Sequence, residues 1–330
     1  MDDRVVIVVN YSVIFYLKKT KTMTSSITFL GSVKIVGNIY DDDKKNKNIS
    51  AIEVVGDLLI VGADEGNKIK ILKHNGEGYA IEQSISLSND KEIDIEGIAC
   101  EGSIVYVIGS HSAKREQIEL DRSYEQNLRA IETVSTESQR DRLFRLHLNA
   151  DAEIEQASLR TIIDHHNLLQ LFSKIPSKEN GIDIEGIAVQ DGMLYVGFRG
   201  PVLRDNWVPI LKCKFATSIN RADLVFINLG GRGIRDLTPV QDGFLILAGP
   251  VGDGPGSYQI YAWDGDDCLP GTRSSGKMGQ IELLGEIPVY ENAKAEGIAL
   301  LQENPLDYEV MVVFDGVENG APVRCKIIKK

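Results

Sequence analysis

The heptapeptide IDIEGIA occurs twice in this chain, at 93–99 and again at 182–188. Segments with the same layout begin at Ser50, Ile234 and Ala295. In each of the five, a short apolar strand is followed by a tight turn and by a second apolar strand that ends in a small residue. A unit that recurs in this way indicates a repeat architecture, in which neighbouring units bury one another's apolar faces.

Each strand pair is followed by two further strand-like runs, except that the last unit has only one, RCKIIKK at 324–330. The run SITFLGSVKIVG at 26–37 supplies the strand that this unit lacks. We therefore predict an all-β fold, a β-propeller of five four-stranded antiparallel blades closed by an N-terminal strand, because closure removes exposed sheet edges. A sixth blade is the alternative, since about 90 residues separate the two heptapeptides.

The excess length of the second unit is assigned to two insertions, at about 111–142 and about 161–180, of which the second has the apolar spacing of a short helix. We expect residues 23–330 to form a single domain around these insertions. The apolar leader 1–22 is too short to span a bilayer and has neither a basic start nor a cleavage site. It is interpreted as a non-native or disordered segment before Met23, with an extra strand or a poor signal anchor as alternatives.

Composition and charge narrow the expected partners. The chain has a formal net charge of −12, with 43% apolar and 25% charged residues. Nucleic acids and anionic membranes both require a basic surface, so neither is an expected partner. The four cysteines are scattered in the sequence, which indicates free thiols and a cytoplasmic location; they are Cys100, Cys213, Cys268 and Cys325. A closed propeller needs no second copy, so a monomer is expected.

Two carboxylates one residue apart are the main chemical feature of the repeat. Side chains alternate along a strand, so Asp94 and Glu96 point to the same side, as do Asp183 and Glu185. The innermost strand of a blade lines the central channel, so residues at equal height should converge at its mouth. The predicted set is Ser50, Glu96, Glu185, Asp236 and Glu296, with Asn48, Asp94 and Asp183 in the next tier.

Anions gathered in this way need protons, basic side chains or a divalent cation to neutralise them. Ca²⁺ accepts about six to eight oxygen ligands in flexible geometry, so we predict a divalent-cation site and no organic cofactor. The predicted ligands are Asp94, Glu96, Asp183, Glu185, Asp236 and Glu296. The alternatives are acids that accept hydrogen bonds from strand amides and so fix the blade register, or an electrostatic funnel without a bound metal.

Arginines follow on the adjoining turns. Arg199 and Arg204 lie in GFRGPVLRDNW, and Arg232 and Arg235 lie in GGRGIRDLTP. Flanking glycines let the backbone approach closely while a guanidinium reaches inward, so these four are expected to bind a substrate phosphate or carboxylate. Structural ion pairs with the acids are the alternative. His111 follows a strand that should end at the mouth, which makes it the candidate general acid or base.

Signatures of common enzyme classes are missing from the sequence, which contains no GxSxG, GxxxxGK[ST] or HExxH motif and no complete EF-hand loop. The segments GSHS, IEGIA, GFRGPV, GGRGIRDL and LAGP resemble a bacterial family catalogued as a domain of unknown function, over roughly residues 28–325. The resemblance implies a single-domain β-propeller and no particular activity. More distantly, the Glu-Gly strands are similar to those of propeller phytases and lactonases, whose acids bind Ca²⁺ or another divalent ion at the channel mouth. The matching residues are Glu96, Glu185 and Glu296.

Three functions are compatible with these features. A metal-dependent hydrolase would hold Ca²⁺ on the acids and a small anionic substrate, a phosphate ester or a lactone, on the arginines. A non-catalytic platform would bind a ligand or a protein through the polar insertion from His111 to Arg140. A ligand sensor regulated by Ca²⁺ combines the two. The hydrolase is preferred because the predicted charges are concentrated at one mouth.

Overall fold

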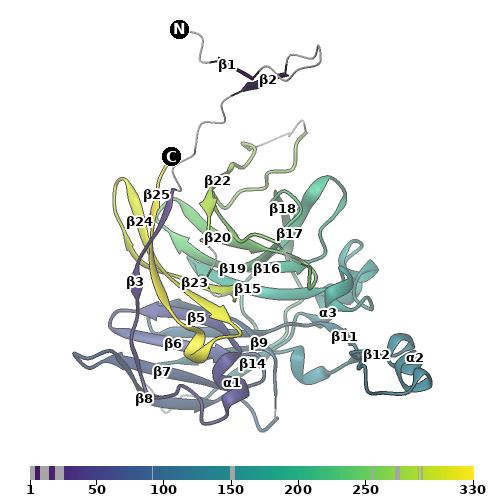
Figure 1. The fold of residues 1–330 in the computed structure, drawn as a ribbon. Coiled ribbons are helices and arrows are strands. Elements are labelled where there is room, and N and C mark those ends of the chain that lie inside the picture. Colours follow the sequence, from purple (N-terminus) through teal and green to yellow (C-terminus); the bar gives the residue numbers. More distant parts are fainter. Residues whose placement is uncertain are drawn as a thin grey trace.

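The computed structural model describes residues 4–7, 15–18, 26–90, 92–148, 153–254, 256–271, 276–288, 290 and 293–330. Within this part of the chain, five sheets form the blades of a β-propeller (Figure 1). The inner strands of successive blades contact one another in a closed cycle. The predicted all-β propeller of four-stranded antiparallel blades is confirmed, and the number of blades is five, not six.

The strands of blades 1 to 4 follow chain order from the inside outward. Blade 1 contains β5 (Ile49–Val55), β6 (Leu58–Ala63), β7 (Lys68–His74) and β8 (Tyr79–Ser86). Blade 2 contains β9 (Ile95–Glu101), β10 (Ile104–Gly109), β13 (Leu143–His147) and β14 (Glu155–Ala157). Blade 3 contains β15 (Asp183–Gln190), β16 (Met193–Gly200), β17 (Trp207–Cys213) and β18 (Asp223–Asn228). Blade 4 contains β19 (Gly233–Val240), β20 (Gly243–Gly249), β21 (Gln259–Trp263) and β22 (Ile281–Glu286).

Blade 5 joins the two ends of the propeller. It contains β23 (Lys294–Glu303), β24 (Asp307–Asp315), β25 (Val323–Ile328) and, as its outer strand, β3 (Ile27–Ser32). Ile27 pairs with Ile327 in this sheet, and both are almost fully buried. Burying an isoleucine side chain contributes roughly 1.5–3 kcal/mol, so the predicted closing strand also adds to the core.

Close packing between inner strands explains why the repeat places a glycine after the acid. A Cβ on Gly97 would lie 3.0 Å from Cγ2 of Ile187 in the next blade, and a Cβ on Gly186 would lie 2.9 Å from Cα of Asp236. Distances this short leave no room for a side chain, so glycine is needed where one inner strand passes the next. The recurrence of Glu-Gly is therefore partly a packing requirement.

A β-bulge interrupts the inner strand of every blade at the same position. In β15, Ile184 pairs with Phe198 and Gly186 pairs with Gly197, so Glu185 between them is left out of the ladder. Each of the other inner strands skips one residue in the same way; the skipped residues are Ser50, Glu96, Arg235 and Glu296. A bulge redirects the unpaired side chain, and all five of these side chains line one cavity.

Short elements decorate the blades. Between β10 and β13 the chain forms β11 (Ala113–Arg115), α2 (Tyr124–Glu132), β12 (Val134–Thr136) and the 3₁₀ turn η1 (Ser138–Arg140). Figure 1 shows α2 and β12 at the edge of the molecule. Between β14 and β15 lie α3 (Arg160–His165), η2 (Leu169–Leu171) and η3 (Ser177–Glu179). The remaining elements are β4 (Ile35–Val36), which pairs parallel to β8, and α1 (Asp43–Lys47), η4 (Arg204–Asn206) and η5 (Glu318–Gly320).

The predicted leader 1–22 lies largely outside the described residues. Only β1 (Arg4–Ile7) and β2 (Phe15–Lys18), which pair antiparallel with each other, are described there. In the described part of the chain, no helix has the length and apolar character needed to cross a membrane. The four cysteines are free thiols, and all except Cys100 are buried.

Candidate functional site at the channel mouth

The five residues at the bulge positions form what we call the ring. They are Ser50, Glu96, Glu185, Arg235 and Glu296. They surround a cavity of about 190 Å³, to which strand ends and loops add further charged groups. Seven carboxylates line this axial cavity: Asp64, Asp94, Glu96, Asp183, Glu185, Glu296 and Asp315. Five basic side chains oppose them: Arg140, Lys178, Arg199, Arg235 and Lys294. The carboxylates exceed the bases by two, so the fully ionised cavity is negative.

The buried Arg235 and the largely buried Arg199 connect three of the acids in one continuous chain. Arg235 Nη1 lies 2.7 Å from Glu185 Oε2 and 2.5 Å from Glu296 Oε2. Arg199 Nη1 lies 2.5 Å from Glu185 Oε1, and its Nη2 is paired with Asp183. Burial raises the pKa of Asp183 and of Glu296 to about 7, against the opposing pull of the guanidinium groups. Arg199 and Arg235 thus make the ion pairs that were the alternative to substrate binding.

A third arginine enters the cavity from an insertion. Arg140 Nη1 lies 2.6 Å from Asp94 Oδ2, and its other nitrogens bind Glu92 and Glu137, each at 2.9 Å. Burial raises the pKa of Asp94, while the charge of Arg140 opposes that rise. The sequence pattern did not identify Arg140, because this residue lies in η1, outside the repeated strands. Lys178 and Lys294 were missed for the same lack of a repeated spacing.

The acids on the opposite side of the ring have a different environment. Among the described residues, neither Glu96 nor Asp64 has a basic partner within ion-pair distance, and the Asp64 carboxylate accepts a hydrogen bond only from the Glu65 amide, at 2.6 Å. Burial, and then the charge of Asp94, raise the pKa of Asp64 to about 8. Burial together with the charges of Asp94 and Glu185 raises the pKa of Glu96 well above its ordinary value. This acidic side of the cavity is therefore where neutralisation is incomplete.

The alignment predicted for blade 4 is wrong by one residue. Arg235 occupies the bulge position, whereas Asp236 pairs with Leu247 in the ladder and does not line the cavity. Asp236 Oδ1 accepts a hydrogen bond from Leu237 N, and Oδ2 accepts one from Ile298 N in blade 5, both at 2.8 Å. Burial raises the pKa of Asp236 well above its ordinary value. Asp236 joins two blades, which is the structural role described as an alternative for these acids.

The position predicted for His111 is also wrong. Its side chain is 0% exposed and is not part of the cavity lining. Nε2 accepts a hydrogen bond from Leu159 N at 3.1 Å, so Nδ1 carries the proton and donates to Gly109 O at 2.9 Å. Burial lowers the pKa of His111 to about 4, so its imidazole is neutral at pH 7. His111 fixes the chain at the start of α3 and does not face the mouth.

Two of the four predicted arginines lie away from the cavity. Arg204 is exposed on η4, and Arg232 donates from Nε to Ser257 O at 3.0 Å and from Nη2 to Ser257 Oγ at 2.8 Å. Neither lines the axial cavity. The structure therefore brings together Asp94, Glu96, Asp183, Glu185 and Glu296 with Arg199 and Arg235.

The donor set is only partly suited to a metal ion. Within the described residues, no group of three or more His, Cys, Asp or Glu side chains is positioned to hold a metal. The physical reason is that Arg140, Arg199 and Arg235 already draw the carboxylates of Asp94, Asp183, Glu185 and Glu296 toward themselves. A divalent cation would need Asp64, Asp94 and Glu96 to turn toward one point.

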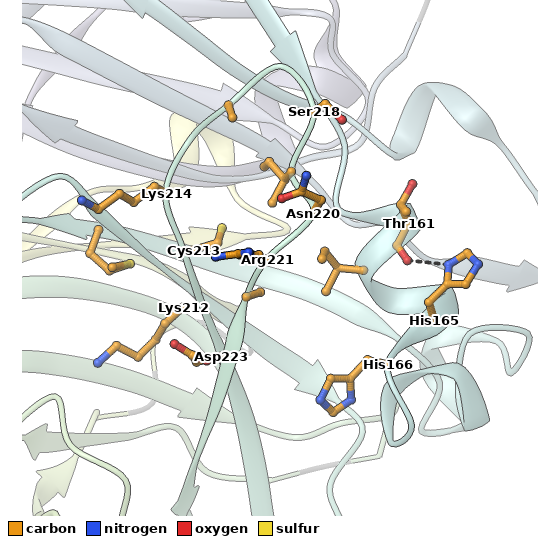
Figure 2. Close-up of a pocket in the computed structure, with 15 residues that line it drawn as sticks. Thr161, His165, His166, Lys212, Cys213, Lys214, Ser218, Asn220, Arg221 and Asp223 are labelled. Atoms are coloured by element: carbon orange, nitrogen blue, oxygen red, sulfur yellow. Dashed lines mark hydrogen bonds between the residues drawn. The ribbon is translucent and has the colours of Figure 1, made fainter.

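A larger hollow of about 790 Å³ lies at the periphery, between α3 and the loop that joins β17 to β18. Figure 2 shows that Lys212 and Lys214 extend away from His165 and His166, so the basic side chains do not converge. Thr161 O is bound to His165 Nδ1 at 2.8 Å. None of the residues predicted for the site lies here, and this hollow is not the candidate site.

The fold and the cavity together define a five-bladed β-propeller with a charged axial mouth. The chain belongs to the family described as "Protein of unknown function (DUF3616)", whose sequence model matches residues 48–162 and 153–324. The resemblance to a propeller family of unknown function is therefore confirmed. A comparison with curated proteins gives no match.

Several solved structures are similar to this chain at low identity. The glutaminyl cyclase of Myxococcus xanthus is 11% identical with a TM-score of 0.45, and the match covers 92% of this chain and 97% of that one. A chain of the nidogen/laminin complex is 12% identical with a TM-score of 0.41, covering 82% and 77%. The hydrazine synthase of Kuenenia stuttgartiensis is 10% identical with a TM-score of 0.39; the match covers 83% of this chain and 65% of that chain's length. Likenesses this distant carry no inference about ligand or activity.

Proposed function

We propose that the protein binds a small ligand at the channel mouth and holds a positive charge on the acidic side of the axial cavity. That charge is either a divalent cation such as Ca²⁺ or an organic ammonium group of the ligand, held by Asp64, Asp94 and Glu96. The observation that carries this proposal is Glu96, a ring carboxylate that has no basic partner among the described residues while Glu185 and Glu296 both have one.

The electrostatic argument follows from the count of charges. Seven carboxylates and five bases line a cavity of about 190 Å³, and burial makes their ionised forms costly. Without a cation, a proton neutralises Asp64 near pH 7, because its pKa is raised to about 8, and the raised pKa of Glu96 favours protonation in the same direction. A bound cation would replace those protons. The overall charge of −12 also raises the local concentration of cations at the surface.

The catalytic form of this proposal is a divalent-metal-dependent hydrolase of a phosphate ester or a lactone. Asp183 and the ring residue Glu296 both have a pKa of about 7, which suits proton transfer at neutral pH. Arg199 and Arg235 are paired with these acids, and protonation of Asp183 or Glu296 would release guanidinium donors to negative charge that develops on the substrate. His111 has no part in this scheme, because it is buried away from the cavity.

The test is a thermal melt of the full chain after EDTA treatment, with Ca²⁺, Mg²⁺ and Mn²⁺ titrated back in one arm and methylammonium and choline in the other. A cation at about 100 times its Kd should stabilise the fold by about 2.7 kcal/mol. Glu96→Gln should abolish the shift. Glu53→Gln is the matched control, since Glu53 is buried in an inner strand but does not line the cavity.

The two arms separate the possible sources of the charge. A saturable shift with a metal alone would direct the search to phosphate esters and lactones, whereas a shift with ammonium alone would indicate an amine ligand. Flat melts in both arms, or an equal shift in the wild type and Glu96→Gln, would refute the proposal.

A second candidate function is protein binding through the insertion between β10 and β13. Among the described residues, six of the fourteen exposed large apolar side chains belong to it: Ile118, Leu120, Tyr124, Leu128, Ile131 and Val134. Exposed apolar side chains gathered on one segment mark a contact surface. Replacing Leu120, Tyr124 and Leu128 with serine should remove specific partners in affinity capture without lowering the melting temperature. Identical partner sets for both proteins would exclude this role.

A further inference from the structure

A groove of about 390 Å³ adjoins the axial cavity on the side of blades 4 and 5. Its boundary with the axial cavity is formed by four basic residues that line both spaces: Lys178, Arg199, Arg235 and Lys294. Most of the remaining wall comes from the loop before β21 and from the segment between β22 and β23, and β24 adds Phe314. A ligand at the mouth could therefore extend into this groove.

The groove has the opposite charge preference from the mouth. Four basic side chains and only two acidic ones, Asp253 and Glu286, line it. Lys178 pairs with Asp253 at 2.8 Å and Lys294 pairs with Asp315 at 3.4 Å, but both lysines are about half exposed. Exposed pairs of this kind contribute roughly 0–1 kcal/mol, so both ammonium groups can turn to a ligand. The groove consequently favours an anion.

Unsatisfied donors lie at the same boundary. Nε of Arg199 and Nε of Arg235 are buried and have no acceptor among the described residues. Arg235 is 4% exposed, and its other nitrogens are occupied by Glu185, Glu296 and the Pro250 carbonyl. Leaving a buried donor without an acceptor is unfavourable. A carboxylate or phosphate placed between the two cavities would supply these acceptors once the guanidinium groups turn to expose Nε.

Flat apolar walls line the rest of the groove. Tyr290 stacks on Phe314 with ring centroids 4.8 Å apart and planes 21° apart. Tyr258 also lines the groove, with the Arg235 guanidinium 5.9 Å from its ring centroid. Aromatic side chains pack best against another flat ring, and a volume of this size is typical of small-ligand sites.

We infer that the groove binds an aromatic group that bears a carboxylate or a phosphate. The anionic substituent lies at Arg199, Arg235 and Lys294, and the aromatic group packs against Tyr258 and Tyr290, which both line the groove. This inference deepens the proposed function, and it depends on that function only for the cationic end of the ligand. A ligand that fills both cavities carries three groups in order. An aromatic group lies in the groove, an anionic group lies at the boundary, and a positively charged group lies at the mouth.

The experiment is a calorimetric titration of the full chain with phenyl phosphate and with benzoate, each compared with its non-aromatic counterpart, inorganic phosphate and acetate. We expect the aromatic probes to bind at least about tenfold more tightly than their counterparts. Tyr258→Leu should remove most of this preference, and Lys294→Met should weaken all four probes. Lys326→Met is the matched control, because Lys326 is a half-exposed lysine of the same blade outside both cavities.

Each outcome decides one element of the inference. Equal affinity for aromatic and non-aromatic probes would overturn the aromatic part, and no binding of any probe, or an equal effect of Lys294→Met and Lys326→Met, would overturn the anion site. Circular dichroism melts check that the variants are folded. Repeating the titration with Glu96→Gln separates this site from the mouth, since aromatic anion binding should persist there even if no cation binds.

Discussion

Replacing Arg235 with methionine tests whether its guanidinium neutralises the ring. The Arg235 side chain is 4% exposed, and Nη1 binds both Glu185 and Glu296, so Arg235→Met removes the only partner that the described residues offer to Glu296. Breaking a buried ion pair from one side costs roughly 3–5 kcal/mol. An unfolding entropy of roughly 2.1 cal/mol/K per residue over 330 residues makes 1 kcal/mol worth about 1.5 °C. The melting temperature at pH 8 should therefore fall by roughly 4–7 °C.

The sign of the pH dependence separates lost charge from lost packing. The pKa of Glu296 is already raised to about 7 by burial, and removing the guanidinium raises it further. When a carboxyl has a raised pKa in the fold, the folded protein loses stability as pH rises through that pKa. The stability deficit of Arg235→Met relative to the wild type should therefore shrink at pH 5, where Glu296 is protonated. Adding Glu296→Gln should restore part of the loss at pH 8. Differential scanning calorimetry measures both, and an equal deficit at pH 5 and pH 8 would refute the reasoning and assign the loss to packing of the arginine stem.

Three further predictions concern single residues. Asp64 has a pKa of about 8 in the fold and about 3.8 when unfolded, so the free energy of unfolding should fall as pH rises between these values. Asp64→Asn should flatten that slope in melts at pH 5 and pH 9. Parallel slopes for the variant and the wild type would contradict this. Asp236→Asn should lower the free energy of unfolding by about 1–3 kcal/mol in urea titrations, because an amide cannot accept from both backbone donors; cation binding should not change. His111 has a pKa of about 4 against an ordinary 6.5, so its contribution to stability should be lost as pH falls from 6.5 to about 4. His111→Asn should therefore make acid unfolding less steep. An unchanged profile would argue against a neutral, buried imidazole.

Two features of the candidate site were accessible from the sequence. Glu96, Glu185 and Glu296 each precede a glycine in the repeat, and they lie together on the ring. Arg199 lies at the end of a second strand and does reach the cavity. Alternation along a strand and the repetition of one unit around an axis are enough to predict this convergence.

The error in blade 4 has a specific cause. Asp236 occupies the position that holds glycine in the three blades with a glutamate on the ring. Matching Asp236 to those glutamates moved the alignment of blade 4 by one residue. Counting back five residues from the turn would have found the ring position, since Gln190 and Val240 both precede a tight turn and lie five residues after Glu185 and Arg235. The bulge also breaks strict alternation, so a period of two does not hold across it.

The sequence by itself determined the architecture. Five copies of one strand pair and an unmatched edge strand near each end indicate a ring of blades closed by β3, and the structure then fixed the number of blades at five. What only the tertiary structure decided is the charge state of the mouth. Arg140 comes from an insertion, Arg199 from a second strand and Arg235 from a bulge, and the ring acids acquire or lack a basic partner according to distances that no local pattern encodes. The physical reason is that alternation and repetition are local properties of the chain, whereas neutralising a buried charge depends on groups that meet only when the ring of blades has closed.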